Sequence, residues 1–319
     1  MQPKLDTTLS YWQSKQAAMF CYFTSVDYLK TLHWTVCDLI NGLVDPLLAT
    51  ADGERRDTLL TDPQWGTRRT SDNWVNNAWP VLKDLQTSVA NSLAARQNNM
   101  YVRPAVDEFL HGIDEFSLEW ATPAEEELFA NAVKKIDTFA GWLDDTLAKE
   151  ELSRWNDFDI SFHFPAFHEL QPRIPRFKVR LDVSAHTGSL PPVTGVYVAL
   201  DDPNATLQFA FAENGGRKLR KANTFNDLGL DALQFVGRDA LWTDHQKMFE
   251  FATLQNYQSI FYDQIFLQGK LQPTLARVAV KRAAITARPA KWYLVEELNE
   301  DWAADSSQDA EASVPAESH

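Results

Sequence analysis

The sequence predicts an α+β protein, in which an N-terminal helical bundle packs on a smaller C-terminal part. Two observations lead there. Apolar residues recur at helical spacing through residues 1–155. Three prolines, Pro165, Pro172 and Pro175, then separate this half from short runs rich in β-branched and aromatic residues. We therefore expect the C-terminal part to be a mostly antiparallel sheet with helices.

Four or five helices are expected in the first half. Thr8 is the expected N-cap of the first one, and Gly42 and Pro46 are expected to end the helical pattern that follows it. Pro80 lies inside a later pattern, where it predicts a kink or a start. The expected helical segments are 9–33, 34–43, 74–98 and 104–120, and the polar stretch 51–74 is expected to be a long loop.

The strongest helix signal begins at Thr122. This threonine is a suitable N-cap, Pro123 fits the first helical position, and Glu125 completes a capping box. Apolar residues then alternate four and three apart, which is the spacing of a stripe that packs on another helix. The stripe consists of Phe129, Val133, Ile136, Ala140, Leu143 and Leu147.

The proline-broken connection, residues 154–177, is expected to contain no long helix. After it we expect strands at 177–183, 194–200, 206–212 and 291–298, with helices at 223–235 and 244–265. The second and third strands form an expected hairpin around a turn at 201–205. Its Leu207, Phe209 and Phe211 share one face because side chains alternate along a strand.

These patterns give three units: a helical bundle (1–155), an α+β region with an antiparallel sheet (156–302) and an acidic tail (303–319). The tail is expected to be disordered because it has almost no bulky apolar residue. The apolar connection is expected to pack down, so the first two units need not be independent domains.

The formal net charge of −14 is unevenly distributed. Residues 1–155 carry 14 basic and 23 acidic residues (−9), residues 156–295 carry 16 and 13 (+3), and residues 296–319 carry none and 8 (−8). Such acidity suits either simple solubility or a face that attracts a basic partner. Nucleic acid is not an expected partner, because the sequence has no basic stripe interleaved with aromatic residues. The one dense basic cluster, 217–221, resembles a hairpin loop or its exit.

Candidate catalytic and metal-binding patterns are weak. His163 and His168 are five residues apart with Pro165 between them, which does not match a helical zinc motif. Cys21 and Cys37 fit reduced thiols in a cytosolic protein better than a disulfide framework. We find no nucleophile elbow, phosphate-binding loop or dinucleotide fingerprint. We expect no enzyme activity, no cofactor and no metal, although an unrecognised site stays open.

The beginning of the chain lacks a basic segment followed by an apolar one, so no signal peptide is evident. The longest apolar run, residues 17–23, is far shorter than the roughly 20 residues that cross a bilayer. These features predict a soluble, cytoplasmic protein without membrane association.

The layout resembles that of bacterial polymorphic-toxin immunity proteins of the immunity protein 71 and 72 families. The resemblance rests on a helical half, an "RW" dipeptide, the segment "PRIPRF" and the strand text "AHTGSLPPVTGVYV" that continues to "AL", and it is sharpest over residues 172–212. It implies a non-enzymatic antitoxin, made beside a toxin that a contact-dependent or type VI secretion system delivers in bacterial competition.

By this resemblance the protein is expected to bind a cognate toxin domain and to block its active site or its activation. A basic toxin domain would suit the acidic charge of the chain. A scaffold or regulatory binding protein, and an enzyme, are the alternatives that stay open. As contacts for the partner protein we can suggest only an acidic pair and an acidic turn, both expected to be exposed. They contribute Asp144 and Asp145 from the pair, and Asp201, Asp202 and Asn204 from the turn. The sequence does not indicate an oligomeric state.

Overall fold

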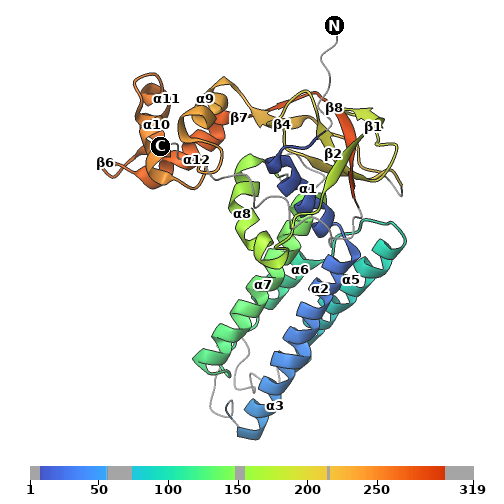
Figure 1. The fold of residues 1–319 in the computed structure, drawn as a ribbon. Coiled ribbons are helices and arrows are strands. Elements are labelled where there is room, and N and C mark those ends of the chain that lie inside the picture. The colour runs from blue at the N-terminus through green and yellow to red at the C-terminus, as the bar shows by residue number, and fades with distance from the viewer. Residues whose placement is uncertain (1–7, 55, 57–73, 148–154, 214–215, 299–319) are drawn as a thin grey trace, which may run out of the picture.

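The computed structural model describes residues 8–54, 56, 74–147, 155–213 and 216–298. It confirms the α+β class, with helices first and an antiparallel sheet in the C-terminal part. Most of the loop expected at 51–74, and the tail expected at 303–319, lie outside the described residues. In Figure 1 the long helices of the first half extend downward from the sheet. A group of shorter helices, α9 to α12, lies at the upper left, beside the sheet.

Helices dominate the first half. Their bounds are α1 (Tyr11–Phe23), α2 (Val26–Cys37), η1 (Asp38–Val44, π-helical), α3 (Asp45–Glu54), η2 (Trp74–Ala78, π-helical), α5 (Trp79–Gln97), α6 (Val106–Ile113), α7 (Pro123–Leu147) and α8 (Asp157–Leu170). None of the helices in the described ranges is both long enough and apolar enough to cross a bilayer.

The single helix expected at 9–33 is in fact two helices. Ser10, not Thr8, caps α1, through a capping box with Gln13. Thr24 ends α1, and its hydroxyl donates a hydrogen bond to the carbonyl of Phe20 at 2.7 Å. Ser25 then caps α2 by accepting from the amide of Tyr28. Ser and Thr compete for backbone groups in this way, so the apolar pattern continues across a break in the helix.

The helix end expected at Gly42 and Pro46 was also wrong. The chain passes through Gly42 in a π-helical turn, in which the amide of Asp45 donates to the carbonyl of Ile40. Pro46 then occupies the second position of α3, where a missing amide costs little. The expected start near Pro80 is confirmed, because α5 begins at Trp79. The helix expected at 104–120 is only α6, which ends at Ile113.

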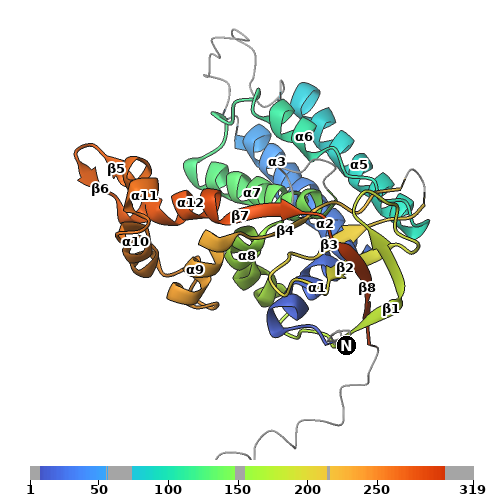
Figure 2. The same cartoon turned by 90° about the horizontal axis from the view of Figure 1, so that it is seen from above.

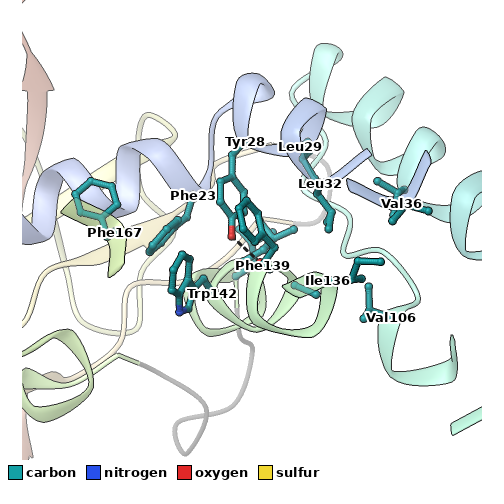
Figure 3. Packing of buried hydrophobic residues seen from close by; sticks show 14 of the residues in the cluster. Phe23, Tyr28, Leu29, Leu32, Val36, Val106, Ile136, Phe139, Trp142 and Phe167 are labelled. Atoms are coloured by element: carbon teal, nitrogen blue, oxygen red, sulfur yellow. Dashed lines mark hydrogen bonds between the residues drawn. The ribbon is translucent and has the colours of Figure 1, made fainter. Parts of the chain in front are cut away.

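Helix α7 confirms the capping prediction. Thr122 and Glu125 exchange hydrogen bonds of 2.8 and 3.4 Å. The predicted stripe of α7 packs into the main core, with Ile136 and Leu143 fully buried. Figure 3 shows Phe139 of this helix beside Tyr28 of α2, whose hydroxyl donates to the Phe139 carbonyl at 2.7 Å.

The expectation that the prolines forbid a long helix in the connection was wrong. Helix α8 runs for 14 residues with Pro165 inside it. An interior proline costs about 3 kcal/mol, since it removes one backbone hydrogen bond and crowds the preceding turn. A strong N-cap offsets part of this cost, because the side chain of Asn156 accepts from the amides of Phe158 and Asp159. Burial of Ile160 and Phe167 contributes the rest.

The main sheet has four antiparallel strands in the order β1-β8-β2-β3. They are β1 (Phe177–His186), β2 (Gly195–Ala199), β3 (Gln208–Ala210) and β8 (Lys291–Glu297). All four were expected: β1 and β3 from alternation, β2 from its β-branched and aromatic residues, and β8 as the last strand. The predicted hairpin is confirmed by the β2–β3 pairing, and Leu207, Phe209 and Phe211 all contact the main core.

Between β3 and β8 the chain leaves the sheet and returns. It leaves through β4 (Ala222–Phe225) and returns through β7 (Ile285–Arg288), and these two strands pair with each other. The residues between them, 226–284, are called the inserted unit here. They contain α9 (Asp227–Val236), α10 (His245–Thr253), α11 (Gln258–Ile265), a short hairpin of β5 (Phe266–Leu267) and β6 (Lys270–Leu271), and α12 (Pro273–Ala284).

Two expectations in this region need correction. A helix was expected at 223–235, but residues 223–225 belong to strand β4. The helix in this region, α9, starts only after its N-cap, Asn226. The helix expected at 244–265 is divided into α10 and α11 by a turn at residues 254–257. Gly229 lets α9 lie against the β4–β7 ribbon, because a Cβ there would be 2.5 Å from the carbonyl oxygen of Ala284.

Three groups of buried side chains hold the chain together. The main core joins helices α1 to α8 to one face of the sheet, through Val196, Val198 and Val295 among others. A smaller group on the other face of the sheet centres on Trp292 and Tyr197. The inserted unit has a core of its own, which includes Phe251 and Phe261. The unit boundaries expected at 155 and 302 stay predictions, although the first core spans position 155.

Candidate functional site

The most distinctive pocket lies at the C-terminal end of α7. It has a volume of about 480 Å³. Its walls come from the segment 101–105, the first turn of α6, the last turn of α7 and the chain that follows β3. Three chain segments that are far apart in sequence therefore meet here, and we call this feature the acidic pocket.

Aromatic rings form one wall of the acidic pocket. Tyr101 stacks on Phe211, with ring centroids 5.3 Å apart and planes 20° from parallel. The guanidinium of Arg96 lies 4.0 Å from the centre of the Tyr101 ring. Arg96 is buried and donates to the carbonyl of Thr24, which fixes its position. The rings of this wall are thus held from behind by packing and by a cation–π contact.

The charged groups of the pocket are mostly acidic. Asp107 and Glu108 stand in the first turn of α6, and Asp144 is on α7. Arg103 is the basic residue among the lining residues, and its Nη1 is 3.7 Å from Oδ2 of Asp144. Three carboxylates against one guanidinium leave the lining with a formal charge of −2 when all are ionised.

The pKa of Asp144 is raised to about 6, chiefly by burial; Arg103 opposes this shift, and the carboxylates of Asp107 and Glu108 add to it. Oδ1 of Asp144 is buried and has no hydrogen-bond partner among the described residues. A buried acceptor without a donor is costly, because it lost its water on folding. This oxygen is closed to solvent, so a bound molecule could reach it only after the Asp144 side chain turned.

Asp145, the next residue, faces a much narrower gap that Arg217 also lines. Burial raises its pKa to about 7; Asp159 and Asp144 add to the shift and Lys281 opposes it. Arg217 is buried, and its Nη1 donates to the carbonyl of Thr146 at 2.7 Å. This arginine stabilises the last turn of α7, where carbonyl groups lack partners within the helix.

The five predicted contact residues do not form one site. Asp144 and Asp145 were expected to be exposed, but the structure buries both of them partly against the end of α7. Asp201 is exposed and Asp202 half-buried, and both pair with Arg288 of β7, at 3.3 and 2.9 Å. These two ion pairs hold the turn against the β4–β7 ribbon, so the two carboxylates are already paired within the chain.

Asn204 belongs to the same turn, since its backbone amide donates to Oδ1 of Asp202 at 3.0 Å, and it lines a second groove of about 450 Å³ between α1 and α9. Tyr11 and Trp12 line it together with Lys15, whose ammonium is 4.4 Å from the centre of the Tyr11 ring. Arg238 closes the far side and lies over Trp12 at 4.5 Å. This groove mixes both signs of charge, since Asp239 also lines it.

The histidines and cysteines occupy packed surroundings. His163 accepts a hydrogen bond from the indole of Trp142 at 3.3 Å, and His168 stacks on Phe164. Cys21 and Cys37 are free thiols, and burial raises the pKa of Cys21 to about 12. A thiol with so high a pKa is a poor nucleophile. The described residues contain no group of three or more side chains suited to hold a metal ion.

Sequence reasoning missed most of the acidic pocket. Asp107 and Glu108 look like ordinary acids in the first turn of a helix, where they favour the helix dipole. Arg103 and Tyr101 stand in a segment without a motif. Only the tertiary fold brings them to Asp144, 36 residues or more along the chain. No local signal in the sequence could have shown this convergence.

No family model matches the chain, and no curated protein or solved structure is significantly similar to it.

Proposed function

We propose that the protein is an immunity protein that binds a secreted bacterial toxin domain in the cytoplasm and neutralises it. The resemblance of residues 172–212 to immunity protein families supports this class. The acidic pocket supports the kind of partner, a protein with a basic surface. The pocket is the observation that carries the proposal, since it provides negative charge and an aromatic wall in one place.

A protruding arginine or lysine side chain of the toxin fits this pocket. Its donors would pair with the carboxylates of Asp107, Glu108 and Asp144, which line the pocket. Its positive charge would also relieve the repulsion between Asp144 and the carboxylates of α6. A guanidinium makes two parallel hydrogen bonds to a carboxylate, so arginine is the better match. Acidic charge around such an anchor increases the association rate with a basic partner.

The experiment has two stages. The tagged full chain is first captured from its native cell while secretion systems are active, and the co-purifying proteins are identified. A domain recovered in equal amount and encoded next to this gene is then purified and tested for toxicity and for inhibition by this protein. Inhibition at equal molar ratio supports the proposal. If the neighbouring toxin is expressed but neither binds nor is inhibited, the proposal is wrong.

Variants test the site itself. The double variant Asp144→Asn and Glu108→Gln removes two charges and is expected to weaken toxin binding about tenfold at low salt, or about 1.4 kcal/mol. Asp137→Asn is the matched control, because Asp137 is exposed on the same helix outside the pocket. Equal affinities for the control and the double variant would move the interface away from the acidic pocket.

A further inference from the structure

The end of the inserted unit exposes a compact set of apolar side chains. They are Ile260 (46% exposed), Tyr262 (40%), Phe266 (40%), Leu267 (53%) and Leu271 (37%). All lie within twelve consecutive residues, on α11 and the β5–β6 hairpin. We call this set the apolar tip. Figure 2 shows the hairpin at the outer end of the inserted unit, away from the sheet and from the long helices.

The backbone of the tip is well defined. Gln268 and Gly269 both have positive φ, 53° and 77°, as the two central residues of a tight hairpin turn of type I′ require. The pairs Phe266–Leu271 and Leu267–Lys270 form the ladder, and the amide of Gln272 donates to the carbonyl of Ile265 at 2.7 Å. Tyr262 stacks on Phe266, with centroids 5.1 Å apart. The turn and this stack hold the apolar side chains outward.

No other described part of the chain buries the four strand residues of the β5–β6 hairpin. All four strand residues are exposed, and none belongs to the core of the inserted unit. A two-stranded hairpin of this size is only marginally stable in water without a packing partner. Several adjacent exposed aromatic and aliphatic side chains on a defined backbone are typical of an interaction surface.

Charge indicates which partner fits. Across positions 254–276 the sequence has two charged residues, Asp263 and Lys270, in a chain that is 23% charged with a net charge of −14. Two copies of so acidic a protein repel each other over most of their surfaces. The tip is a surface where this repulsion is small. Asp263 and Lys270 have opposite signs, so a twofold arrangement can place each beside its opposite.

We propose that the apolar tip is the contact surface of a homodimer, in which the tips of two copies pack against each other about a twofold axis. A twofold contact uses the same patch on both copies, and a patch that is apolar and carries one charge of each sign is self-complementary. Burial of Phe266, Leu267 and Leu271 would stabilise the hairpin that the single chain leaves uncovered. This inference is independent of the acidic pocket, because the pocket and the apolar tip have no residue in common.

Sedimentation equilibrium of the full chain across 1–100 µM, roughly the range of weak to moderate dimers, tests the proposal. We expect a monomer–dimer equilibrium that persists or strengthens at high salt, because apolar contacts are not screened. The double variant Phe266→Ser and Leu267→Ser is expected to weaken dimerisation at least tenfold. The control is Leu128→Ser with Leu181→Ser, which removes two exposed leucines outside the tip.

Three results would overturn the proposal. One is a monomer at every concentration, and another is a dimer that the tip variant leaves intact. The third is a monomer whose tip variant loses affinity for a toxin, which would assign the tip to that partner instead. Circular dichroism melting of each variant separates loss of contact from loss of fold, and a tip variant with an unchanged melt keeps the test valid.

Discussion

The main body, meaning the described residues outside 226–284, and the inserted unit bury different side chains. Tryptophan, tyrosine and phenylalanine from five helices meet in the main core. Phe23 alone lies within 6 Å of the ring centres of Tyr22, Tyr28, Trp142, Trp155 and Phe167. The inserted unit has three large buried aromatics, and much of the rest of its core is alanine: Ala232, Ala252, Ala276, Ala279 and Ala284.

This difference shows that the two regions depend on different contacts. The main body derives its stability from a large area of buried aromatic surface. The inserted unit leaves much of its apolar surface outside and depends on its attachment to α8. Asp157 of that helix accepts from the indole of Trp242 and pairs with Arg238, both at 2.6 Å. Lys281 pairs with Asp159, two residues later on α8, at 2.8 Å.

The largest effect is expected from the main core. Phe23→Ala removes a fully buried ring at the centre of the aromatic cluster, so we expect a loss of about 3–5 kcal/mol in the free energy of unfolding. Urea denaturation followed by circular dichroism measures it. Leu128→Ala, an exposed position on α7, should change stability by less than about 0.5 kcal/mol. A loss below about 1 kcal/mol for Phe23→Ala would contradict the central place of this cluster.

The next largest loss of stability is expected from the contacts that attach the inserted unit to α8. Asp157→Ala leaves Arg238 without its buried partner and Trp242 without its acceptor, so we expect a loss of about 3 kcal/mol. Hydrogen exchange followed by mass spectrometry should show faster exchange in the inserted unit, with the main core still protected.

Asp159→Ala is the matched control on the same helix. Its pair with Lys281 has both side chains 28% exposed, and a pair of this kind contributes up to about 1 kcal/mol. If both variants gave the same loss, or if exchange increased equally in the main body, the inserted unit would not be separately attached.

The sequence predicted the regions whose signals are local. The capping box at Thr122, the α7 stripe, the alternation in β1 and β3 and the β-branched residues of β2 each depend on neighbouring residues. Helix α8 was missed because proline is a local penalty, whereas the burial of Ile160 and Phe167 that outweighs it is tertiary. The pairing of β4 with β7 was missed for a similar reason, since their sequences lie some sixty residues apart.

The acidic pocket shows the same limit at the level of the site. Asp144 and Asp145 could be selected as an acidic pair, but adjacent acids near a helix end usually face solvent, and that rule gave the wrong exposure. Partial burial depends on the segment 101–108, and nothing local in that segment indicates that it reaches α7. The change in pKa of these acids could therefore not be predicted from the sequence.

The smallest expected effect is the pH dependence of this acidic pair. The pKa of Asp145 is raised from 3.8 to about 7, chiefly by burial. An acid with a raised pKa binds its proton more tightly in the folded state than in the unfolded state. Its contribution is therefore most favourable below about pH 4, and it is lost as the pH rises towards 7. Asp145→Asn removes the ionisation, so the variant should be more stable than the wild type at pH 8.

Solvent near the carboxylate limits this gain to at most about 1 kcal/mol. Thermal melts of the two proteins between pH 4 and pH 8 measure it, and the difference between them should grow as the pH increases. Asp137→Asn makes the same charge change at an exposed position of α7 and should give a difference that does not vary with pH. A constant difference for Asp145→Asn as well would mean that Asp145 ionises as a solvated acid. The main body would then carry no strained charge at the end of α7.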